Sequence, residues 1–435
     1  MIFHARPAAA QAHPASARAD RIIARCRELA RISDVPGETT RTFLSPGARV
    51  AQQTLRMWME AAGLTVRTDA IGNLRGLLPA ADANAPRLLI GSHIDTVPNA
   101  GAFDGVLGVI LGLGVIERLR EDNPAAGLSV AIELIAFSEE EGVRFAKPFL
   151  GSLALIGELD RSAMDLVDGS GITVAEAVAE YGLDPGDLAA ATADPSAAAY
   201  LEFHIEQGPV LESEGLPVAV VENIVGQSRL ALTFTGHSNH AGTTPMGALR
   251  RDALAAAAEW VVEVERYGGA TAGLVATVGR LDVTRGAGNI IPAQVVATLD
   301  VRHASDAVRR VAVEHLLESA VAAGRARAVD VVPRTTLDQS AVPMDPRLTA
   351  LLQQAAEAAT GGPVRRLDSG AGHDAMIVAR KIPSAMLFLR SPAGLSHHPD
   401  ESVLPEDVEV ALAVGLEFAR RIPGLLVAGK SAEGT

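Results

Sequence analysis

The sequence is most constrained by a loop that follows a short apolar segment. Residues 87–90, Arg-Leu-Leu-Ile, are typical of a buried strand, and the loop then continues to Gly105. It carries His93, Asp95 and Asp104 between glycines and a proline, so the strand cannot continue through it. Polar side chains at the end of a buried strand are typical of binding sites in open α/β sheets. On its own, however, the pattern also fits an ordinary Asp-Gly turn.

Two later segments also place ionisable residues in or after an apolar strand. The apolar segment 128–137 is followed by Glu-Glu-Glu-Gly at 139–142. Three carboxylates in a row usually form a solvated face, but their position after a buried strand favours a function. In the segment 200–208, Glu202 and His204 are two residues apart and therefore share one face of a strand. Burial of such groups is costly unless they are paired or bind a metal ion.

Length and composition exclude several classes of protein. The 435 residues, 48% of them hydrophobic, are enough for two domains with large cores. The formal net charge of −14 argues against a binder of nucleic acid or of anionic membranes, because both need a basic surface. No segment has the apolar length of a membrane span. The single cysteine, Cys26, allows no internal disulfide and fits a reducing cytoplasm.

The order of the expected elements divides the chain into domains. Residues 1–20 lack the apolar core of a signal peptide and are expected to form a disordered tail. Residues 21–223 and 335–430 are expected to form one discontinuous domain. The inserted residues 224–334 show the strand-helix-strand-strand-helix-strand order of a ferredoxin-like unit, with one strand expected at 273–282. Residues 160–198 are expected to be helical.

Seven short motifs, taken together and in order, resemble those of a known enzyme class. They lie at 91–105, 138–145, 204–208, 239–246, 289–292, 372–375 and 396–401. From about residue 41 to its last helix, the chain looks like a dinuclear metal-dependent hydrolase of the aminoacylase/carboxypeptidase class. The motif His-Ile-Glu-Gln-Gly at 204–208 resembles the branch that cleaves ureido (N-carbamoyl) groups. This resemblance implies an α/β fold: a metallopeptidase-like domain with a mixed central β-sheet flanked by helices, and an inserted ferredoxin-like α+β domain that serves as lid and dimer contact.

The resemblance also implies two divalent metal ions, Zn²⁺ or Mn²⁺, with Co²⁺ as an alternative. His93 and His204 would bind one ion, and Glu141 and His397 the other. Asp104 would bridge the two ions, because a carboxylate has two oxygens to share. Three protein ligands per ion leave room for a water, which is the open pattern of a catalytic site.

Two further residues would act beside the ions. Glu140 would be the general base that takes a proton from water and passes it to the leaving nitrogen. Asp95 would accept a hydrogen bond from the metal-binding histidine two residues before it and orient the ring. Two ambiguities are resolved by the resemblance: relatives carry Glu-Glu-Gly, which fixes the register at Gly142, and their Ser-His-x-Pro pattern selects His397 over His398.

A second set of residues would bind the substrate. The planar guanidinium of Arg302 suits a carboxylate, although an arginine more often forms a surface salt bridge. Gln207, Asn289 and His240 are similar to family residues that bind the ureido and carboxylate groups. His240 would polarise the scissile carbonyl, and in relatives it can come from the partner subunit of a dimer. A homodimer formed through the lid is therefore expected.

Three residues of the segment 369–376 complete this set. Gly370 and Ala371 are expected to offer backbone contacts to the substrate. For His373, catalysis and a structural hydrogen bond both remain open.

The motifs together indicate hydrolysis of a ureido C–N bond in a small carboxylate substrate. Segments 41–46, 135–145 and 369–376 look most like allantoate amidohydrolases, which implies conversion of allantoate to ureidoglycine or ureidoglycolate, ammonia and CO₂ in purine catabolism. N-carbamoyl-L-amino-acid hydrolases and β-ureidopropionases are alternatives, because they share the catalytic residues. A non-catalytic small-molecule binder on the same fold is an alternative of a different class. The presence of Glu140 argues against it, since binding alone needs no base.

Overall fold

The computed structural model describes residues 17–122, 128–284 and 286–432 of the chain. The contacts among them define two compact units. Unit 1 takes its residues from Met1–Glu222, Met344–Leu367 and His373–Thr435, and unit 2 from Asn223–Pro343 and Asp368–Gly372. Unit 2 therefore interrupts unit 1 in the sequence, and it also includes a short loop from the later part of the chain.

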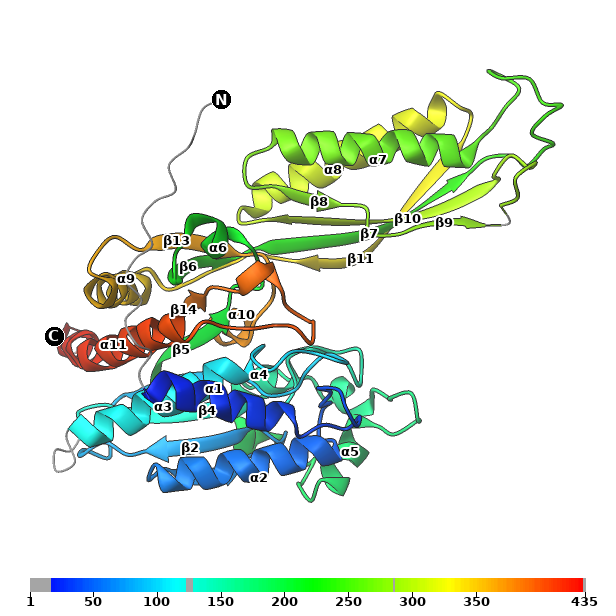
Figure 1. Ribbon diagram of the computed structural model, residues 1–435. Coiled ribbons are helices and arrows are strands. Elements are labelled where there is room, and N and C mark those ends of the chain that lie inside the picture. The colour runs from blue at the N-terminus through cyan, green and yellow to red at the C-terminus, as the bar shows by residue number, and fades with distance from the viewer. Residues whose placement is uncertain (1–16, 123–127, 285, 433–435) are drawn as a thin grey trace. The chain divides into compact units, whose positions relative to one another are not determined.

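Unit 1 is built around a mixed β-sheet with helices packed against it (Figure 1). Its strands follow one another in the order β1-β2-β4-β3-β5-β14-β6, and β13 also pairs with β6. These strands are β1 (Thr65–Thr68), β2 (Leu74–Leu78), β3 (Arg87–His93), β4 (Ala131–Phe137), β5 (Ala197–Ile205), β6 (Val218–Ile224), β13 (Arg365–Ser369) and β14 (Ser384–Leu389).

The helices of unit 1 come from segments that are far apart in the sequence. They are α1 (Ala17–Ala30), α2 (Pro46–Ala61), α3 (Val106–Asp122), α4 (Leu150–Leu155), α5 (Val174–Glu180), α6 (Val210–Glu214), α9 (Pro346–Thr360), α10 (Asp374–Val378) and α11 (Pro405–Ala432). Short 3-10 helices lie at Arg161–Asp165, Leu188–Ala191 and Pro392–Gly394. The start of α2 follows from its sequence: the Ser45 hydroxyl accepts the N–H of Ala48 at 3.0 Å, and Pro46 stands at the first helical position.

The strands at the centre of the unit 1 sheet are parallel. β3 pairs in parallel with β4 and with β5, and β5 pairs in parallel with β14. The carboxyl ends of these neighbouring strands therefore lie at one edge of the sheet, where α/β proteins commonly bind ligands. This arrangement brings the ends of four distant segments of the sequence to the same place.

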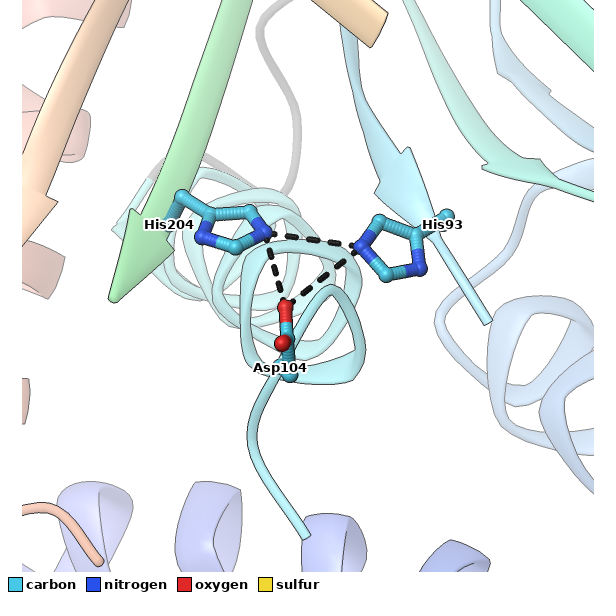
Figure 2. Close-up of side chains that lie close together, drawn as sticks. All are labelled: His93, Asp104 and His204. Carbon is cyan, nitrogen blue, oxygen red and sulfur yellow. Dashed lines mark hydrogen bonds and ion pairs between the residues drawn. The ribbon is translucent and has the colours of Figure 1, made fainter. Parts of the chain in front are cut away.

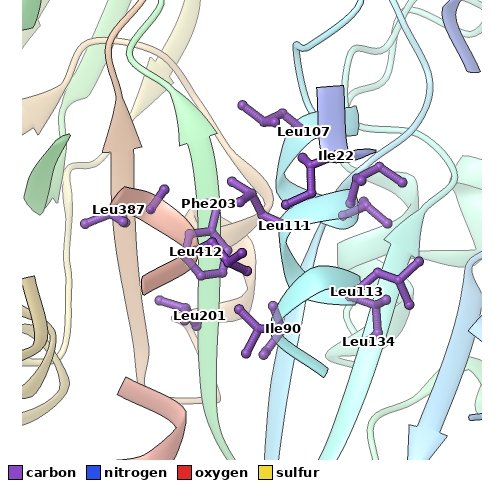
Figure 3. Packing of buried hydrophobic residues seen from close by; sticks show 14 of the residues in the cluster. Ile22, Ile90, Leu107, Leu111, Leu113, Leu134, Leu201, Phe203, Leu387 and Leu412 are labelled. Atoms are coloured by element: carbon purple, nitrogen blue, oxygen red, sulfur yellow. The ribbon is translucent and has the colours of Figure 1, made fainter. Parts of the chain in front are cut away.

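Helix α3 lies in the core of unit 1, and its residues 106–116 are all buried. Figure 3 shows its leucines packed among side chains of the sheet and of α11; those labelled include Leu107, Leu111, Leu113, Ile90, Leu134, Leu201, Phe203 and Leu412. Each fully buried leucine of this kind contributes about 1.5–3 kcal/mol. The glycines of α3 serve close packing, as the sequence predicts: a Cβ added to Gly112 would lie 2.6 Å from the Leu134 side chain.

Unit 2 is an antiparallel sheet with two helices on one face (Figure 1). The strands follow the order β11-β7-β10-β8, and β9 also pairs with β10. The elements are β7 (Gly226–Thr235), α7 (Ala253–Ala270), β8 (Val275–Thr277), β9 (Leu281–Thr284), β10 (Gln294–His303), α8 (Asp306–Arg325), β11 (Asp330–Gln339) and β12 (Val342–Pro343). Alternate residues of β10 are buried in the core formed with α7 and α8, and the residues between them lie on the other face.

The fold class expected from the sequence is confirmed, because a mixed sheet flanked by helices is interrupted by an α+β insertion. Some expected elements are wrong in detail. Residues 273–282 do not form one strand; they contribute to β8 and β9, which are separated at Gly279. Residues 160–198 hold only one α-helix, α5, because glycines and prolines repeatedly interrupt the segment.

Two expected boundaries also need correction. β11 continues to Gln339, beyond the boundary expected at residue 334, even though it contains Pro333. Proline is tolerated there because β11 is an edge strand. Of the tail expected at residues 1–20, residues 1–16 lie outside the described part of the chain, whereas 17–20 begin α1, where Ala19 is fully buried. None of the helices in the described ranges combines the length and apolar character needed to cross a bilayer.

Candidate metal centre

Six sequence-predicted residues of unit 1 lie at the carboxyl edge of its parallel strands. His93 is the last residue of β3, and His204 lies near the end of β5. Glu140 and Glu141 follow β4, and His397 lies in the loop after β14. Asp104 lies in the loop that leads into α3. The sheet topology thus explains why residues up to 304 positions apart in the sequence meet.

Asp104 lies at the centre of the cluster, and Figure 2 shows it pointing toward His93 and His204. Its Oδ1 is 3.6 Å from Nε2 of His93 and 3.2 Å from Nε2 of His204. The two Nε2 atoms are 3.5 Å apart. Two imidazole nitrogens and a carboxylate oxygen therefore converge within 4.8 Å of one another, which suits a metal ion.

The hydrogen bonds of the two Nδ1 atoms leave both Nε2 atoms suited to binding a cation. Nδ1 of His93 lies 3.0 Å from the backbone carbonyl of Asp95, and Nδ1 of His204 lies 3.0 Å from that of Ile205. Because a carbonyl only accepts, each Nδ1 must carry the proton as donor. Each Nε2 must then hold a second proton or offer its lone pair to a cation, as metal-binding histidines do. The buried Oδ1 of Asp104 has no hydrogen-bond partner either. These residues therefore fit a divalent ion.

The second oxygen of Asp104 faces a different group. Its Oδ2 is 3.1 Å from Nε2 of His397, and the same nitrogen is 3.4 Å from Oε1 of Glu141. These three residues also offer ligand atoms within 4.8 Å of one another. One carboxylate thus faces two separate groups of ligand atoms, one with each oxygen. His397 is held at a φ of +56°, a left-handed conformation that is uncommon outside glycine and often occurs at functional sites.

Glu140 is buried beside this cluster, and its carboxylate groups with His93 and Glu141 within the same 4.8 Å limit. Asp95 holds this segment in place, because its carboxylate accepts the backbone N–H of Glu140 at 3.0 Å and that of Glu141 at 3.1 Å. The sequence predicts that the carboxylate of Asp95 orients His93. Its Oδ1 is 3.5 Å from Nδ1 of His93, but the backbone carbonyl of Asp95 is closer, at 3.0 Å.

The position of Asp104 depends on two residues that the sequence did not single out. Oε1 of Glu401 accepts the backbone N–H groups of Phe103 and Asp104 at 2.8 and 2.9 Å. Gly105 has a φ of +65°, and an added Cβ would collide with the ring of His93. The signal for Glu401 was its place in the motif at 396–401, but only the structure shows which loop it contacts.

The charges of the cluster shift several pKa values. Burial lowers the pKa of His93, but the nearby carboxylates of Asp104 and Asp95 raise it well above its ordinary value. Contacts with Asp104 and Glu141 raise the pKa of His397 to about 10. Burial raises the pKa of Glu140 well above its ordinary value. The carboxylates of the cluster therefore favour positive charge on the rings of His93 and His397.

Gln207 belongs to the same cluster. Its Nε2 donates to Oδ2 of Asp104 and to the hydroxyl of Ser396, both at 3.1 Å. Its Oε1 is buried and has no hydrogen-bond partner, and its φ is +58°. The side chain therefore keeps an acceptor available beside the metal-ligand candidates.

His373 and Glu202 lie behind His204. The ring of His373 packs edge-on against that of His204 with centroids 4.4 Å apart, and burial lowers the pKa of His373 well below its ordinary value. Glu202 accepts the backbone N–H of Ala375 at 2.7 Å and the Tyr200 hydroxyl at 3.1 Å. A neutral His373 thus supports the ring of His204.

The remaining predicted substrate residues lie in unit 2 and form two pairs. His240 forms a β-bridge with Ile290, and the backbone carbonyl of Asn289 accepts the N–H of Ala241 at 2.9 Å, so the loops of His240 and Asn289 are joined. Arg302 donates from Nη1 to the carbonyl of Gly370 at 2.6 Å. Within the described residues, no hydrogen bond or ion pair joins these two pairs.

Ala371 lies beside Gly370 in the loop of unit 2. Its backbone N–H donates to the Ser369 hydroxyl at 3.2 Å, and its carbonyl accepts from that hydroxyl at 2.9 Å. This local turn holds the carbonyl of Gly370 against Arg302.

Comparison with known proteins agrees with this geometry. Residues 89–421 match the model of peptidase family M20/M25/M40. The chain is 38% identical over 432 residues to allantoate deiminase 2 of Glycine max, covering 93% of this chain and 89% of that protein. It is 41% identical over 414 residues to N-carbamoyl-L-amino-acid amidohydrolase of Paenarthrobacter aurescens, covering 93% and 98%.

A solved structure gives the same result. The crystal structure of an amidase of the hydantoinase/carbamoylase family from Burkholderia multivorans superposes with a TM-score of 0.85 at 32% identity, covering 92% of this chain and 97% of that one. The family match extends over most of the chain and includes the candidate ligands from His93 to His397. The chain therefore belongs to peptidase family M20/M25/M40.

Proposed function

We propose that this protein hydrolyses a ureido C–N bond in a small carboxylate substrate, with allantoate as the first candidate. The observation that carries the proposal is the arrangement of Asp104, whose two oxygens face two separate groups of ligand atoms beside a buried Glu140. Relatives that match most of the chain are named for allantoate or for N-carbamoyl-L-amino acids. Both names describe hydrolysis of amide-type C–N bonds that are not peptide bonds.

The proposed ligands are those the sequence predicts. His93 and His204 would hold one divalent ion, Glu141 and His397 a second, and Asp104 both. The nitrogen and oxygen ligands suit Zn²⁺ or Mn²⁺, with Co²⁺ as a further candidate. When bound, such ions acidify water and stabilise negative charge that develops on oxygen.

Glu140 would transfer the proton. Its carboxylate lies with ligand atoms of His93 and Glu141, within reach of a water that enters the cluster. It would take one proton from the attacking water and deliver it to the nitrogen that leaves. The C–N bond breaks as a C–O bond forms. If ammonia leaves, the substituted carbamate that remains decomposes to CO₂ and the amine. If the amine leaves, the carbamate that remains decomposes to CO₂ and ammonia.

The other residues would bind the substrate. Gln207 has a free acceptor oxygen for a ureido N–H. Arg302 would bind the carboxylate, Asn289 and His240 the ureido group, and Gly370 and Ala371 would offer backbone contacts. We also propose a homodimer formed through unit 2, with His240 available to the partner subunit, and a cytoplasmic location in keeping with the single cysteine.

N-carbamoyl-L-amino acids form the second candidate class of substrate. The observation in their favour is the 41% identity to the amidohydrolase of Paenarthrobacter aurescens, which covers 98% of that protein. Initial rates should therefore be measured with the metal-loaded protein on allantoate, on several N-carbamoyl-L-amino acids and on N-carbamoyl-β-alanine. We expect the highest kcat/KM on allantoate. A higher value on a carbamoyl amino acid would replace allantoate as substrate, and no turnover on any of them would refute ureido hydrolysis.

A further inference from the structure

The face of the unit 2 sheet opposite α7 and α8 carries a local excess of positive charge. A hollow of about 970 Å³ lies over this face, and its lining includes four arginines and two aspartates. The arginines are Arg229, Arg280, Arg302 and Arg334. In a protein with a formal net charge of −14, such a surface is suited to an anionic group.

Asp300 lies in this hollow and binds several of the side chains around it. Its Oδ1 accepts from Nε of Arg302 at 2.7 Å, and its Oδ2 accepts from Nη2 of Arg302 at 3.0 Å. Oδ2 also accepts from Nε of Arg229 and from the side-chain amide of Gln227, both at 2.9 Å. One carboxylate thus receives four hydrogen bonds from three side chains.

The sheet register explains this arrangement. Asp300 and Arg302 are two residues apart on β10 and therefore lie on the same face. On the neighbouring strand β7, Arg229 lies opposite Asp300 and Gln227 lies opposite Arg302. Burial raises the pKa of Asp300, but the hydrogen bond and charge of Arg302 bring it below its ordinary value, so the carboxylate is ionised at neutral pH.

The contacts of Arg302 leave a defined part of its guanidinium free. An arginine has five N–H groups. Asp300 takes the N–H of Nε and one on Nη2, and the carbonyl of Gly370 takes one on Nη1. One N–H remains on each Nη atom. Two N–H groups at the end of a fixed guanidinium match the two oxygens of a carboxylate.

We propose that Asp300 is a positioning residue that fixes Arg302 for selection of carboxylate substrates over their uncharged analogues. The inference rests on the proposed role of Arg302 in the reaction. Asp300 also separates Arg302 from Arg229, two cations that would repel each other without it. It acts only through Arg302 and makes no contact with the reacting bond.

The test compares a substrate with its carboxamide, using the full-length metal-loaded protein. The pair is allantoate or an N-carbamoyl-L-amino acid, whichever the wild type turns over faster, together with the amide of its carboxyl group. We expect D300A to raise KM for the acid about tenfold to hundredfold, since charged hydrogen bonds are at stake, and to change kcat little. Rates on the amide should hardly change, so the preference for the acid should largely disappear. D300N, which keeps one acceptor oxygen, should give a smaller effect and serves if D300A does not fold.

The matched control is D282N. Asp282 pairs with Arg280, two residues before it, at 2.6 Å on the same sheet, and this pair is exposed. Rates of D282N on both substrates should equal those of the wild type. An equal loss on acid and amide in D300A would indicate a merely structural role, and tighter binding of the acid would make Asp300 a competitor of the substrate. Either result overturns the inference.

R302A separates this inference from the proposed function. If R302A loses the preference for the acid but D300A keeps it, Arg302 binds the carboxylate and the role of Asp300 is refuted. If R302A keeps the preference, the carboxylate site itself was assigned wrongly.

Discussion

Two clusters of charged residues in unit 1 differ in how the negative charge of their carboxylates is balanced. In the first, Glu133 of β4 binds Arg75 at 2.7 Å and Arg87 at 2.6 Å. In the second, the carboxylates of Asp104 and Glu141 contact histidines. Among the described residues, no arginine or lysine forms an ion pair with this second cluster. The carboxylate of the first cluster is paired with two arginines, whereas the second cluster offers ligand atoms to cations from outside.

The comparison also shows how surroundings decide the role of a glutamate. Glu133 and Glu140 are seven residues apart, and burial raises the pKa of both. Arg75 and Arg87 reverse the effect at Glu133, whose pKa lies below its ordinary value. Glu140 has no such partner, and its pKa is raised well above the ordinary value. A carboxylate held without a fixed counter-charge is suited to proton transfer.

Removal of the bridging carboxylate should have the largest effect. D104N replaces one carboxylate oxygen by an amide nitrogen and removes the negative charge that both ligand groups face, so we expect loss of bound metal and of all measurable turnover. Metal content is measured by elemental analysis after dialysis against a chelator. D69N is the matched control, because Asp69 is equally buried in unit 1 but belongs to the arginine-containing cluster. Retention of two metal ions in D104N would contradict the bridging role.

Loss of the proposed base comes next. E140Q should lower kcat about 100- to 10,000-fold, the usual range for a general base, and should keep its metal. E139Q is the control and also tests the register of the three glutamates, because Glu139 is not among the residues gathered with His93. If E139Q is the inactive variant and E140Q the active one, the assignment is off by one residue.

A substitution in the cluster of Glu133, Arg75 and Arg87 should instead lower the stability of the fold. E133Q leaves buried Arg75 without its closest anionic partner, so unfolding free energy should fall by about 3–5 kcal/mol, measured by denaturant titration. Metal content should not change. E121Q, which breaks the exposed pair with Arg18, should cost less than about 1 kcal/mol. A drop in metal content in E133Q would show that the two clusters are not independent.

The smallest effect concerns pH. Burial raises the pKa of Asp69 to about 6, against an ordinary value of 3.8. The folded protein therefore binds this proton more tightly than the unfolded chain, and the group adds stability as pH falls from about 7 to 4. Residue 69 of D69N cannot titrate. The free energy of unfolding of the wild type should therefore rise relative to that of D69N as the pH falls over that range. A constant difference would mean that Asp69 stays ionised.

The sequence indicates part of the site because three candidate ligands lie at or near a strand end within a short motif. His93, His204 and Glu141 could be placed at one edge of a sheet before any coordinates were known. Contacts between distant segments could not be placed in that way. The hydrogen bonds from the backbone of Asp104 to Glu401, and the pairing of Arg75 with Glu133, depend on tertiary packing that no local pattern encodes.

Prediction from local sequence also fell short where contacts between distant segments determine the structure. The inserted unit is expected to end at residue 334, but the edge position of β11 lets this strand tolerate Pro333 and continue to Gln339. The carboxylate of Asp95, which the resemblance assigns to orientation of a histidine ring, also accepts the backbone N–H groups of Glu140 and Glu141, and no local pattern indicates these contacts. No local pattern identifies the role of Asp300, because its bonds to Arg229 and Gln227 form between two strands.

The contact between Glu401 and the loop of Asp104 has a consequence for biosynthesis. When residue 343 emerges from the ribosome, four of the five proposed ligands have already emerged. All of unit 2 except the loop 368–372 has emerged as well. At that moment β14, which lies between β5 and β6, does not yet exist, nor does the carboxylate that anchors Asp104. The nascent chain therefore cannot bring all five proposed ligands together, with Asp104 anchored, until residues 384–401 have been made.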